Sequence, residues 1–236
     1  MLEKLKTEIY ADGANLKSMI DFNNKDYIKG LTTNPTLMRL AGINNYNTFA
    51  KEILLHVTDK PISFEVFSDD LKEMKEQARI ISSWGDNVYV KLPITNTKGE
   101  FTSEIIKELS NEGVKLNITA LFTIQQLEKI INCFNPEVPS VVSIFAGRIA
   151  DTGVDPLPIM KAALKLLEGS NIKLIWASPR EVFNVVQASD IGCHIITVTA
   201  DILKKLDKIS YDLNIFSLDT VKMFYNDAKK SNYFIE

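Results

Sequence analysis

Residues 87–93 of this 236-residue chain read Asn-Val-Tyr-Val-Lys-Leu-Pro, and this stretch gives the strongest indication of the fold. Its β-branched and aromatic residues are typical of a β-strand. Because successive side chains of a strand point to opposite faces, Tyr89 and Lys91 share one face and the two valines share the other. Apolar neighbours on both sides indicate a sheet that is covered on both faces, where a lysine is unusual.

Seven other runs of this kind alternate with longer segments in which apolar residues recur every three or four positions. The expected strands are residues 8–11, 28–32, 62–66, 88–92, 115–118, 141–145, 173–176 and 193–198. The expected helices are residues 47–57, 69–84, 102–112, 123–132, 156–168, 179–188 and 200–206, with a further amphipathic helix at 218–230. Such alternation is typical of βα units that form a parallel sheet.

Eight strand–helix units in 236 residues predict an α/β fold, a (β/α)8 TIM barrel with an additional C-terminal helix. No stretch rich in Pro, Gly or Ser divides the chain, so we expect one domain over residues 1–236. An open, doubly wound sheet is the alternative. It would require a motif such as Gly-x-Gly-x-x-Gly after a strand, and the sequence contains none.

Charge and composition exclude several classes of protein. The formal net charge of −3 argues against an extended nucleic-acid-binding face. No stretch approaches the roughly 18 apolar residues that a membrane span requires. Residues 1–6 mix charge signs and lack the apolar centre of a signal peptide, so we expect a cytoplasmic protein. Two cysteines without metal-ligand spacing give no reason to expect a metal site.

Polar residues collect at the carboxyl ends of the expected strands, where the active sites of barrel enzymes lie. They are Asp12; Thr32, Thr33 and Asn34; Glu65; Lys91; Asn117 and Thr119; Ser143, followed by Phe145 and Arg148; and Ser178 and Arg180. Each has an ordinary structural explanation, such as a turn at Asp12 or a helix start before Pro35. Their accumulation at one end of the barrel predicts an active site there.

Lys91 is the most informative of these residues. Removal from water disfavours the charged form of a lysine, and a free amine attacks carbonyl carbon atoms to form an imine. Asp12 and Glu65 supply carboxylates for the proton transfers that such chemistry needs. Arg148, Ser178 and Arg180 provide donors for a phosphate group. The alternative is a structural lysine that extends its amine to solvent at the strand end.

Four motifs resemble those of the transaldolase family of class I aldolases. They are Gly-Leu-Thr-Thr-Asn-Pro-Thr-Leu at residues 30–37, Val-Lys-Leu-Pro at 90–93, Leu-Asn-Ile-Thr-Ala-Leu-Phe-Thr at 116–123 and Ala-Ser-Pro-Arg at 177–180. They occur in the family's order, and the similarity extends from about residue 8 to residue 206.

The resemblance implies a role for each candidate residue. Lys91 forms the Schiff base with the ketose donor, Asp12 is the acid/base for the carbon–carbon bond, and Glu65 and Thr119 hold and activate a water molecule. The substrate-binding residues are Thr33, Asn34, Asn117, Ser143 and Phe145, and the phosphate-binding residues are Arg148, Ser178 and Arg180. The resemblance implies no metal or organic cofactor. It also implies that the binding partners are sugar phosphates.

The family contains transaldolases, which pass a dihydroxyacetone unit to an aldehyde, and fructose-6-phosphate aldolases, which release it. In the aldolase branch a glutamine resembles Glu65 and a tyrosine resembles Phe145, so both residues favour a transaldolase. A tyrosine hydroxyl could help water to enter and protonate the bound enamine, and phenylalanine cannot. Two other functions stay open: a barrel that binds a sugar phosphate without turnover, and an isomerase that uses Glu65 as its base.

Two departures from the family pattern bear on the site. Gly13 follows Asp12 where many short members have threonine, which removes a hydroxyl and loosens the turn. Pro179 replaces a common aromatic residue; it predicts an extended Ser178 and a helix that begins with the proline. Both changes leave room for a sugar phosphate outside the pentose phosphate set.

Short members of the family often form decamers through a C-terminal helix, so the resemblance implies a homo-oligomer.

Overall fold

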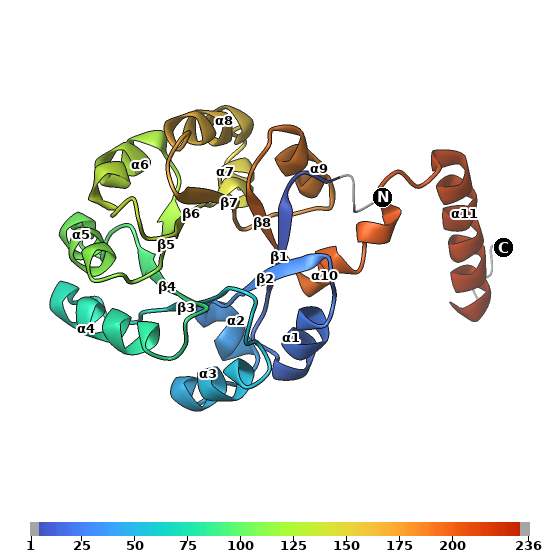
Figure 1. Cartoon of the computed structure of the whole chain (residues 1–236). Helices are drawn as coiled ribbons and strands as arrows, with labels where there is room; N and C mark the ends of the chain where they lie inside the picture. The colour runs from blue at the N-terminus through green and yellow to red at the C-terminus, as the bar shows by residue number, and fades with distance from the viewer. Residues whose placement is uncertain (1–4, 232–236) are drawn as a thin grey trace.

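A computed structural model describes residues 5–231 and places eight parallel strands in one closed barrel (Figure 1). The strands are β1 (Glu8–Asp12), β2 (Ile28–Thr32), β3 (Ile62–Glu65), β4 (Val88–Pro93), β5 (Leu116–Leu121), β6 (Ser140–Ile144), β7 (Ile172–Trp176) and β8 (Ile195–Thr199). They follow one another in chain order, and β8 pairs with β1 to close the ring. The predicted (β/α)8 barrel is confirmed, and the open sheet is excluded.

All the helices except the last, α11, surround the barrel (Figure 1). They are α1 (Leu16–Asn23), α2 (Pro35–Leu40), α3 (Tyr46–Leu54), α4 (Leu71–Ser82), α5 (Ser103–Asn111), α6 (Ile124–Ile130), α7 (Ala146–Asp151), α8 (Leu157–Leu166), α9 (Phe183–Asp190), α10 (Ala200–Leu203) and α11 (Leu213–Ser231), with 3₁₀ turns η2 (Ile131–Cys133) and η3 (Leu206–Lys208). Helices α1, α2 and α7 were not among the predicted ranges. They have 8, 6 and 6 residues, too few for a clear helical period.

The predicted alternation along β4 is confirmed. Val88 and Val90 are buried in the main core. Tyr89 packs instead with an inner layer formed by Tyr10, Val141, Ile175, Ala177 and Ile195. A Cβ atom on Gly30 would lie 2.5 Å from the Tyr10 ring, so a glycine on β2 makes room for this aromatic side chain. The inner layer fills the barrel beneath Lys91, which leaves the polar strand ends at the mouth.

Helix α11 is the predicted C-terminal helix, and it begins five residues before the predicted range 218–230. It contains no buried residue and stands beside the barrel in Figure 1. Large apolar side chains on it are exposed, among them Leu213 (80%) and Phe224 (63%). No helix in residues 5–231 is long and apolar enough to cross a membrane. Residues 1–4 of the segment that was read for a signal peptide lie outside the described part.

Candidate active site

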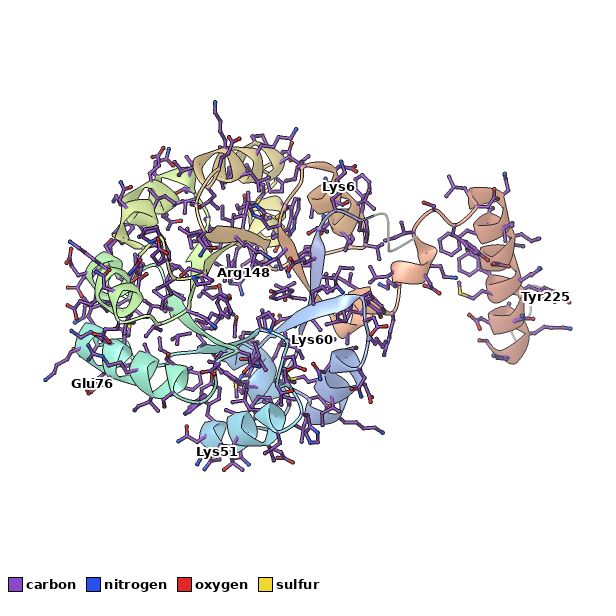
Figure 2. The ribbon with its side chains drawn as sticks, in the orientation of Figure 1. Lys6, Lys51, Lys60, Glu76, Arg148 and Tyr225 are labelled. Atoms are coloured by element: carbon purple, nitrogen blue, oxygen red, sulfur yellow. The ribbon has the colours of Figure 1, made fainter. Side chains whose placement is uncertain are left out.

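A cavity of about 400 Å³ opens at the carboxyl ends of the strands. Every predicted site residue except Thr33 and Asn117 lines it: Asp12, Asn34, Glu65, Lys91, Thr119, Ser143, Phe145, Arg148, Ser178 and Arg180. Figure 2 shows Arg148 near the middle of the ring of strands. Residues from seven strand ends, far apart in the sequence, therefore meet in one place.

Lys91 is 8% exposed, and its amine is held by two neighbours. The Nζ atom donates a hydrogen bond to the Thr33 carbonyl oxygen over 3.0 Å. It also lies 3.2 Å from Oε2 of Glu65. The register of β3 and β4 pairs Glu65 with Lys91, which explains why the two side chains emerge together. The amine is directed into the cavity and not extended to bulk solvent, which disagrees with the structural alternative for Lys91.

Asp12 faces the cavity from the end of β1. Its Oδ1 atom accepts a hydrogen bond from the Thr32 hydroxyl at 2.8 Å, and its Oδ2 atom accepts one from Asn34 Nδ2 at 3.1 Å. Burial raises the pKa of the Asp12 carboxyl, although the charge of Lys91 and the two donors oppose this shift. A carboxyl in such an environment is suited to both accepting and donating a proton.

Asn34 holds Asp12 in place while it caps a helix. Its Oδ1 atom accepts the Leu37 backbone N–H at 2.9 Å, as expected for the residue before a helix that begins with proline. Since the same side chain donates to Asp12 through Nδ2, the start of α2 fixes the orientation of that carboxylate.

Thr119 presents a buried hydroxyl to the cavity. The side chain is on β5 and is 2% exposed, and its Oγ1 atom has no hydrogen-bond partner among the described residues. The next residue, Ala120, has a positive φ of 62°, and the register between β5 and β6 shifts between Ile118 and Leu121. An irregularity of this kind redirects side chains. The free hydroxyl is a suitable site for a water molecule or a substrate oxygen.

Thr33 and Asn117 differ from the prediction, because both are fully buried and neither lines the cavity. The Thr33 hydroxyl donates to the Ser63 carbonyl at 2.9 Å. Asn117 donates to the Ser63 hydroxyl at 3.0 Å and accepts from the Ser143 hydroxyl at 2.8 Å. These hydrogen bonds lie beneath the cavity, where the Thr33 carbonyl contacts Lys91 and the Asn117 side chain contacts Ser143. A direct contact of either side chain with a substrate stays a prediction.

Arg148 and Arg180 also line the cavity. Arg148, on α7, has its guanidinium carbon 5.3 Å from the centre of the Phe145 ring. Arg180 forms an ion pair with Asp151 at the end of the same helix. Both arginines are exposed, which suits the binding of a charged group at the cavity mouth.

The turn at Ser178 does not have the predicted conformation. Ser178 has a positive φ of 61° instead of an extended backbone, and α9 begins at Phe183 instead of Pro179. The Asn184 side chain accepts the backbone N–H groups of Arg180 (2.7 Å) and Glu181 (3.1 Å), which stabilises the intervening loop. A Cβ on Gly147 would lie 1.7 Å from the Ser178 carbonyl oxygen, so the turn packs directly on α7.

Sequence reasoning missed four residues that shape the site. Thr197 on β8 shares a 2.5 Å contact with the Thr32 hydroxyl beneath Asp12. Tyr46 bonds to the backbone of Glu65, Gly147 permits the Ser178 turn, and Asp151 pairs with Arg180. Two of them carried a local signal: Gly147 lies directly before a candidate arginine, and Thr197 lies at the end of the expected strand 193–198. Tyr46 and Asp151 act through contacts between elements that are distant in the sequence.

Comparisons with known proteins found a family model and sequence relatives that match the chain. Residues 9–233 match a family model described as "Transaldolase/Fructose-6-phosphate aldolase". The chain is 32% identical over 201 residues to a "Probable transaldolase" of Streptococcus equi subsp. zooepidemicus, which covers 84% of this chain and 89% of that protein. It is 32% identical over 200 residues to a "Probable transaldolase" of Dehalococcoides mccartyi, with the same coverage.

A solved structure from Coccidioides immitis, described as belonging to the dihydrodipicolinate synthase family, resembles the chain with a TM-score of 0.61 at 12% identity. The likeness covers 84% of this chain and 68% of that one, and it shows the barrel fold alone.

Proposed function

The chain belongs to the transaldolase/fructose-6-phosphate aldolase family, and from this we propose that it is a transaldolase that acts through a Schiff base on Lys91. It would transfer a dihydroxyacetone unit from a ketose phosphate, such as fructose 6-phosphate or sedoheptulose 7-phosphate, to an aldose phosphate. The observation that carries the proposal is the buried amine of Lys91, which lies in the cavity 3.2 Å from Glu65.

The first step joins Lys91 to the ketose. After the ammonium loses a proton, its nitrogen attacks the C2 carbonyl and gives a carbinolamine, which loses water to form the imine. Glu65 is close enough to Lys91 to exchange that proton. The unpartnered Thr119 hydroxyl is suited to hold the water that leaves and later returns. Burial protects the imine from uncontrolled hydrolysis until the transfer is complete.

The second step breaks the C3–C4 bond. The Asp12 carboxylate takes the proton of the C4 hydroxyl, the bond electrons move to the imine, and an aldehyde phosphate leaves an enamine on Lys91. In the transfer, the enamine attacks the carbonyl of an acceptor, and Asp12 returns its proton to the new hydroxyl. Asn34 and Thr32 keep the carboxylate oriented for both events.

The phosphate group would lie between Arg148, Ser178 and Arg180. Guanidinium groups match phosphate oxygens with two donors each. These residues line the same cavity as Lys91, so one sugar phosphate could contact both.

A fructose-6-phosphate aldolase that releases free dihydroxyacetone is the second candidate within the family. Phe145 favours the transferase, because its ring lines the cavity without a hydroxyl that can deliver a proton or water to the enamine. Glu65 favours it through the similarity of that position to transaldolases. A barrel that only binds sugar phosphates is the non-catalytic alternative.

Borohydride reduction in the presence of fructose 6-phosphate tests the chemistry. Peptide mass spectrometry should find a dihydroxyacetone-sized adduct on Lys91, and Lys91→Met should abolish it. Lys115→Met, at the residue directly before β5 and so at the other end of the barrel, is a matched control. Binding of the sugar phosphate without an adduct would favour the non-catalytic barrel, and full activity of Lys91→Met would favour an isomerase.

Free dihydroxyacetone distinguishes the transferase from the aldolase. The enzyme is incubated with fructose 6-phosphate, with and without erythrose 4-phosphate. A transaldolase forms the seven-carbon product when the acceptor is present and releases little dihydroxyacetone without it. Substantial release in the absence of the acceptor would make the chain an aldolase.

We also infer a homo-oligomer, of which a decamer is one form, because α11 leaves its apolar residues exposed. Tyr225 projects away from the barrel in Figure 2 and is 61% exposed. The measurement is molar mass by light scattering, for the full chain and for a Val221→Asp, Phe224→Asp variant. We expect a multimer that dissociates in the variant; a full chain with the mass of one subunit contradicts the inference. The cytoplasmic location stays a prediction.

A further inference from the structure

At Glu65, the last residue of β3, the neighbouring strand β2 no longer supplies hydrogen-bond partners. On the β2 side of β3, the Leu31 N–H donates to the Pro61 carbonyl at 2.8 Å, and the Thr33 N–H donates to the Ser63 carbonyl at 3.2 Å. The next position in this ladder is Glu65. The ladder stops there, because the Thr33 carbonyl accepts from Lys91 Nζ and residue 35 is a proline, which has no N–H for the Glu65 carbonyl. The backbone N–H and C=O of Glu65 therefore need another partner.

Tyr46, at the start of α3, takes the place of the missing strand. Its hydroxyl accepts the Glu65 N–H at 2.7 Å and donates to the Glu65 carbonyl oxygen at 3.1 Å. A hydroxyl can make both bonds at once, because its single oxygen atom both accepts and donates. Burial raises the pKa of the Tyr46 phenol, so the group keeps the proton that it donates.

Three aromatic rings fix the position of this hydroxyl. The Tyr46 ring centre lies 4.5 Å from that of Phe67, 5.6 Å from that of Trp84 and 6.0 Å from that of Phe64. The contacts to Trp84 and Phe64 are edge-to-face, a favourable arrangement for aromatic side chains. The ring is thus anchored by Trp84 in the turn after α4, by Phe67 in the loop before α4 and by Phe64, the strand residue next to Glu65.

The other side of this segment is tied to Lys91. The Val66 N–H donates to the Lys91 carbonyl at 3.0 Å, and the Glu65 carboxylate contacts the Lys91 amine at 3.2 Å. Glu65 is therefore held on both sides: the Tyr46 hydroxyl bonds to its backbone on one side, and β4 contacts it on the other.

We propose that Tyr46 is a positioning residue that sets the Glu65 carboxylate against the Lys91 amine. It lies outside the barrel wall and does not line the cavity, so it acts through Glu65 and not on the substrate. This inference rests on the proposed Schiff-base function. Small displacements of reacting groups slow catalysis, by up to about a hundredfold for a shift near 1 Å.

Tyr46→Phe tests the proposal, because it keeps the ring and removes only the hydroxyl. We expect kcat to fall roughly ten- to a hundredfold while KM changes less than about twofold. Acetylation of Lys91 by acetic anhydride, followed by peptide mass spectrometry, gives a second measurement that needs no sugar phosphate. It should be faster in Tyr46→Phe, because a displaced Glu65 no longer holds the Lys91 amine in its 3.2 Å contact.

Tyr89→Phe is the matched control. Its hydroxyl lies in a separate cavity with Glu8 and Tyr10, at the other end of the barrel, so kcat and Lys91 acetylation should equal those of the wild type. Trp84→Leu keeps the phenol but removes one supporting ring, and should change both measurements in the same direction to a smaller extent. It carries the test if Tyr46→Phe does not fold.

Two outcomes separate this inference from the function it rests on. Wild-type kcat together with wild-type Lys91 acetylation in Tyr46→Phe would overturn the role of Tyr46. If the wild-type protein forms no adduct on Lys91, the proposed function fails. Acetylation then decides the role of Tyr46 alone: faster labelling of Lys91 supports it, and unchanged labelling rejects it.

Discussion

Arg180 and Asp151 form a two-point ion pair at the mouth of the cavity. The Arg180 Nη2 atom lies 2.5 Å from Oδ2 of Asp151, and Nε lies 3.1 Å from each carboxylate oxygen. The arginine that we assign to the phosphate group is thus already engaged by a carboxylate. A phosphate must share or displace that partner, and it also meets the negative charge of Asp151.

Asp151→Asn should therefore strengthen phosphate binding. Both partners are about half exposed, and exposed pairs contribute about 0.2–1 kcal/mol, so KM for a sugar phosphate should fall up to about fivefold. The measurement is KM for fructose 6-phosphate at low and high salt. Glu112→Gln removes the similar pair with Arg79 on the outer surface and should leave KM unchanged. A higher KM in Asp151→Asn would mean that the carboxylate holds Arg180 in its binding orientation.

Gly147→Ala should damage the phosphate end of the site. The new Cβ would lie 1.7 Å from the Ser178 carbonyl oxygen, a backbone atom, so the Ser178 turn must move. We expect a loss of about 1–3 kcal/mol in unfolding free energy, as for overpacked sites, and a higher KM. Urea unfolding and steady-state kinetics measure both.

Gly13→Ala is the control for that substitution. Its Cβ would lie 3.7 Å from the Met19 side chain, an ordinary contact. Stability should stay within about 0.5 kcal/mol of the wild type. If Gly147→Ala loses no more unfolding free energy than Gly13→Ala, the backbone around Ser178 can move away from the new Cβ at little cost.

The barrel was predictable because its evidence is local and repeated. Each strand has its own run of β-branched residues, and all eight were found with bounds within three residues. The largest error is at β5, predicted to end at Ile118 and observed to end at Leu121. Thr119 and Ala120 extend this strand through a left-handed residue, and no sequence pattern marks such a conformation in an alanine.

The part of the site that consists of residues at strand ends was predictable from the sequence. The residues of the cavity wall follow from the rule that barrel active sites lie there. The supporting contacts do not: Tyr46 reaches Glu65 from another element, and Thr33 and Asn117 are buried beneath the cavity. Their positions depend on tertiary packing, which a single sequence does not specify.

Asp12→Asn should stabilise the protein while it removes activity. Burial raises the folded-state pKa of Asp12, so the folded state favours the protonated form and stability is lost as the pH rises through that pKa. An amide carries no charge to desolvate. Its oxygen can accept from Asn34, and its nitrogen can donate to Thr32, whose hydroxyl then donates to Thr197.

The expected results are a higher Tm at neutral pH, an advantage that disappears in acid, and a loss of at least about a hundredfold in kcat. Thermal unfolding at several pH values, with kinetics at neutral pH, tests both. Retained activity would show that Asp12 does not take part in the proton transfer. An unchanged Tm at every pH would show that burial of the charged Asp12 carboxylate does not destabilise the folded state.

Phe145→Tyr should convert transfer into release. The Phe145 ring lines the cavity next to Ser143, so a hydroxyl added to it would enter the space where the enamine forms. There it can deliver a proton or order a water molecule, and general acid–base assistance is worth tenfold or more. Dihydroxyacetone release without an acceptor should rise by roughly tenfold or more. Phe122→Tyr is the matched control, because that ring lies 5.7 Å from Phe145 and does not line the cavity. If both variants behave as the wild type, the cavity as a whole protects the enamine, and the missing hydroxyl at position 145 does not.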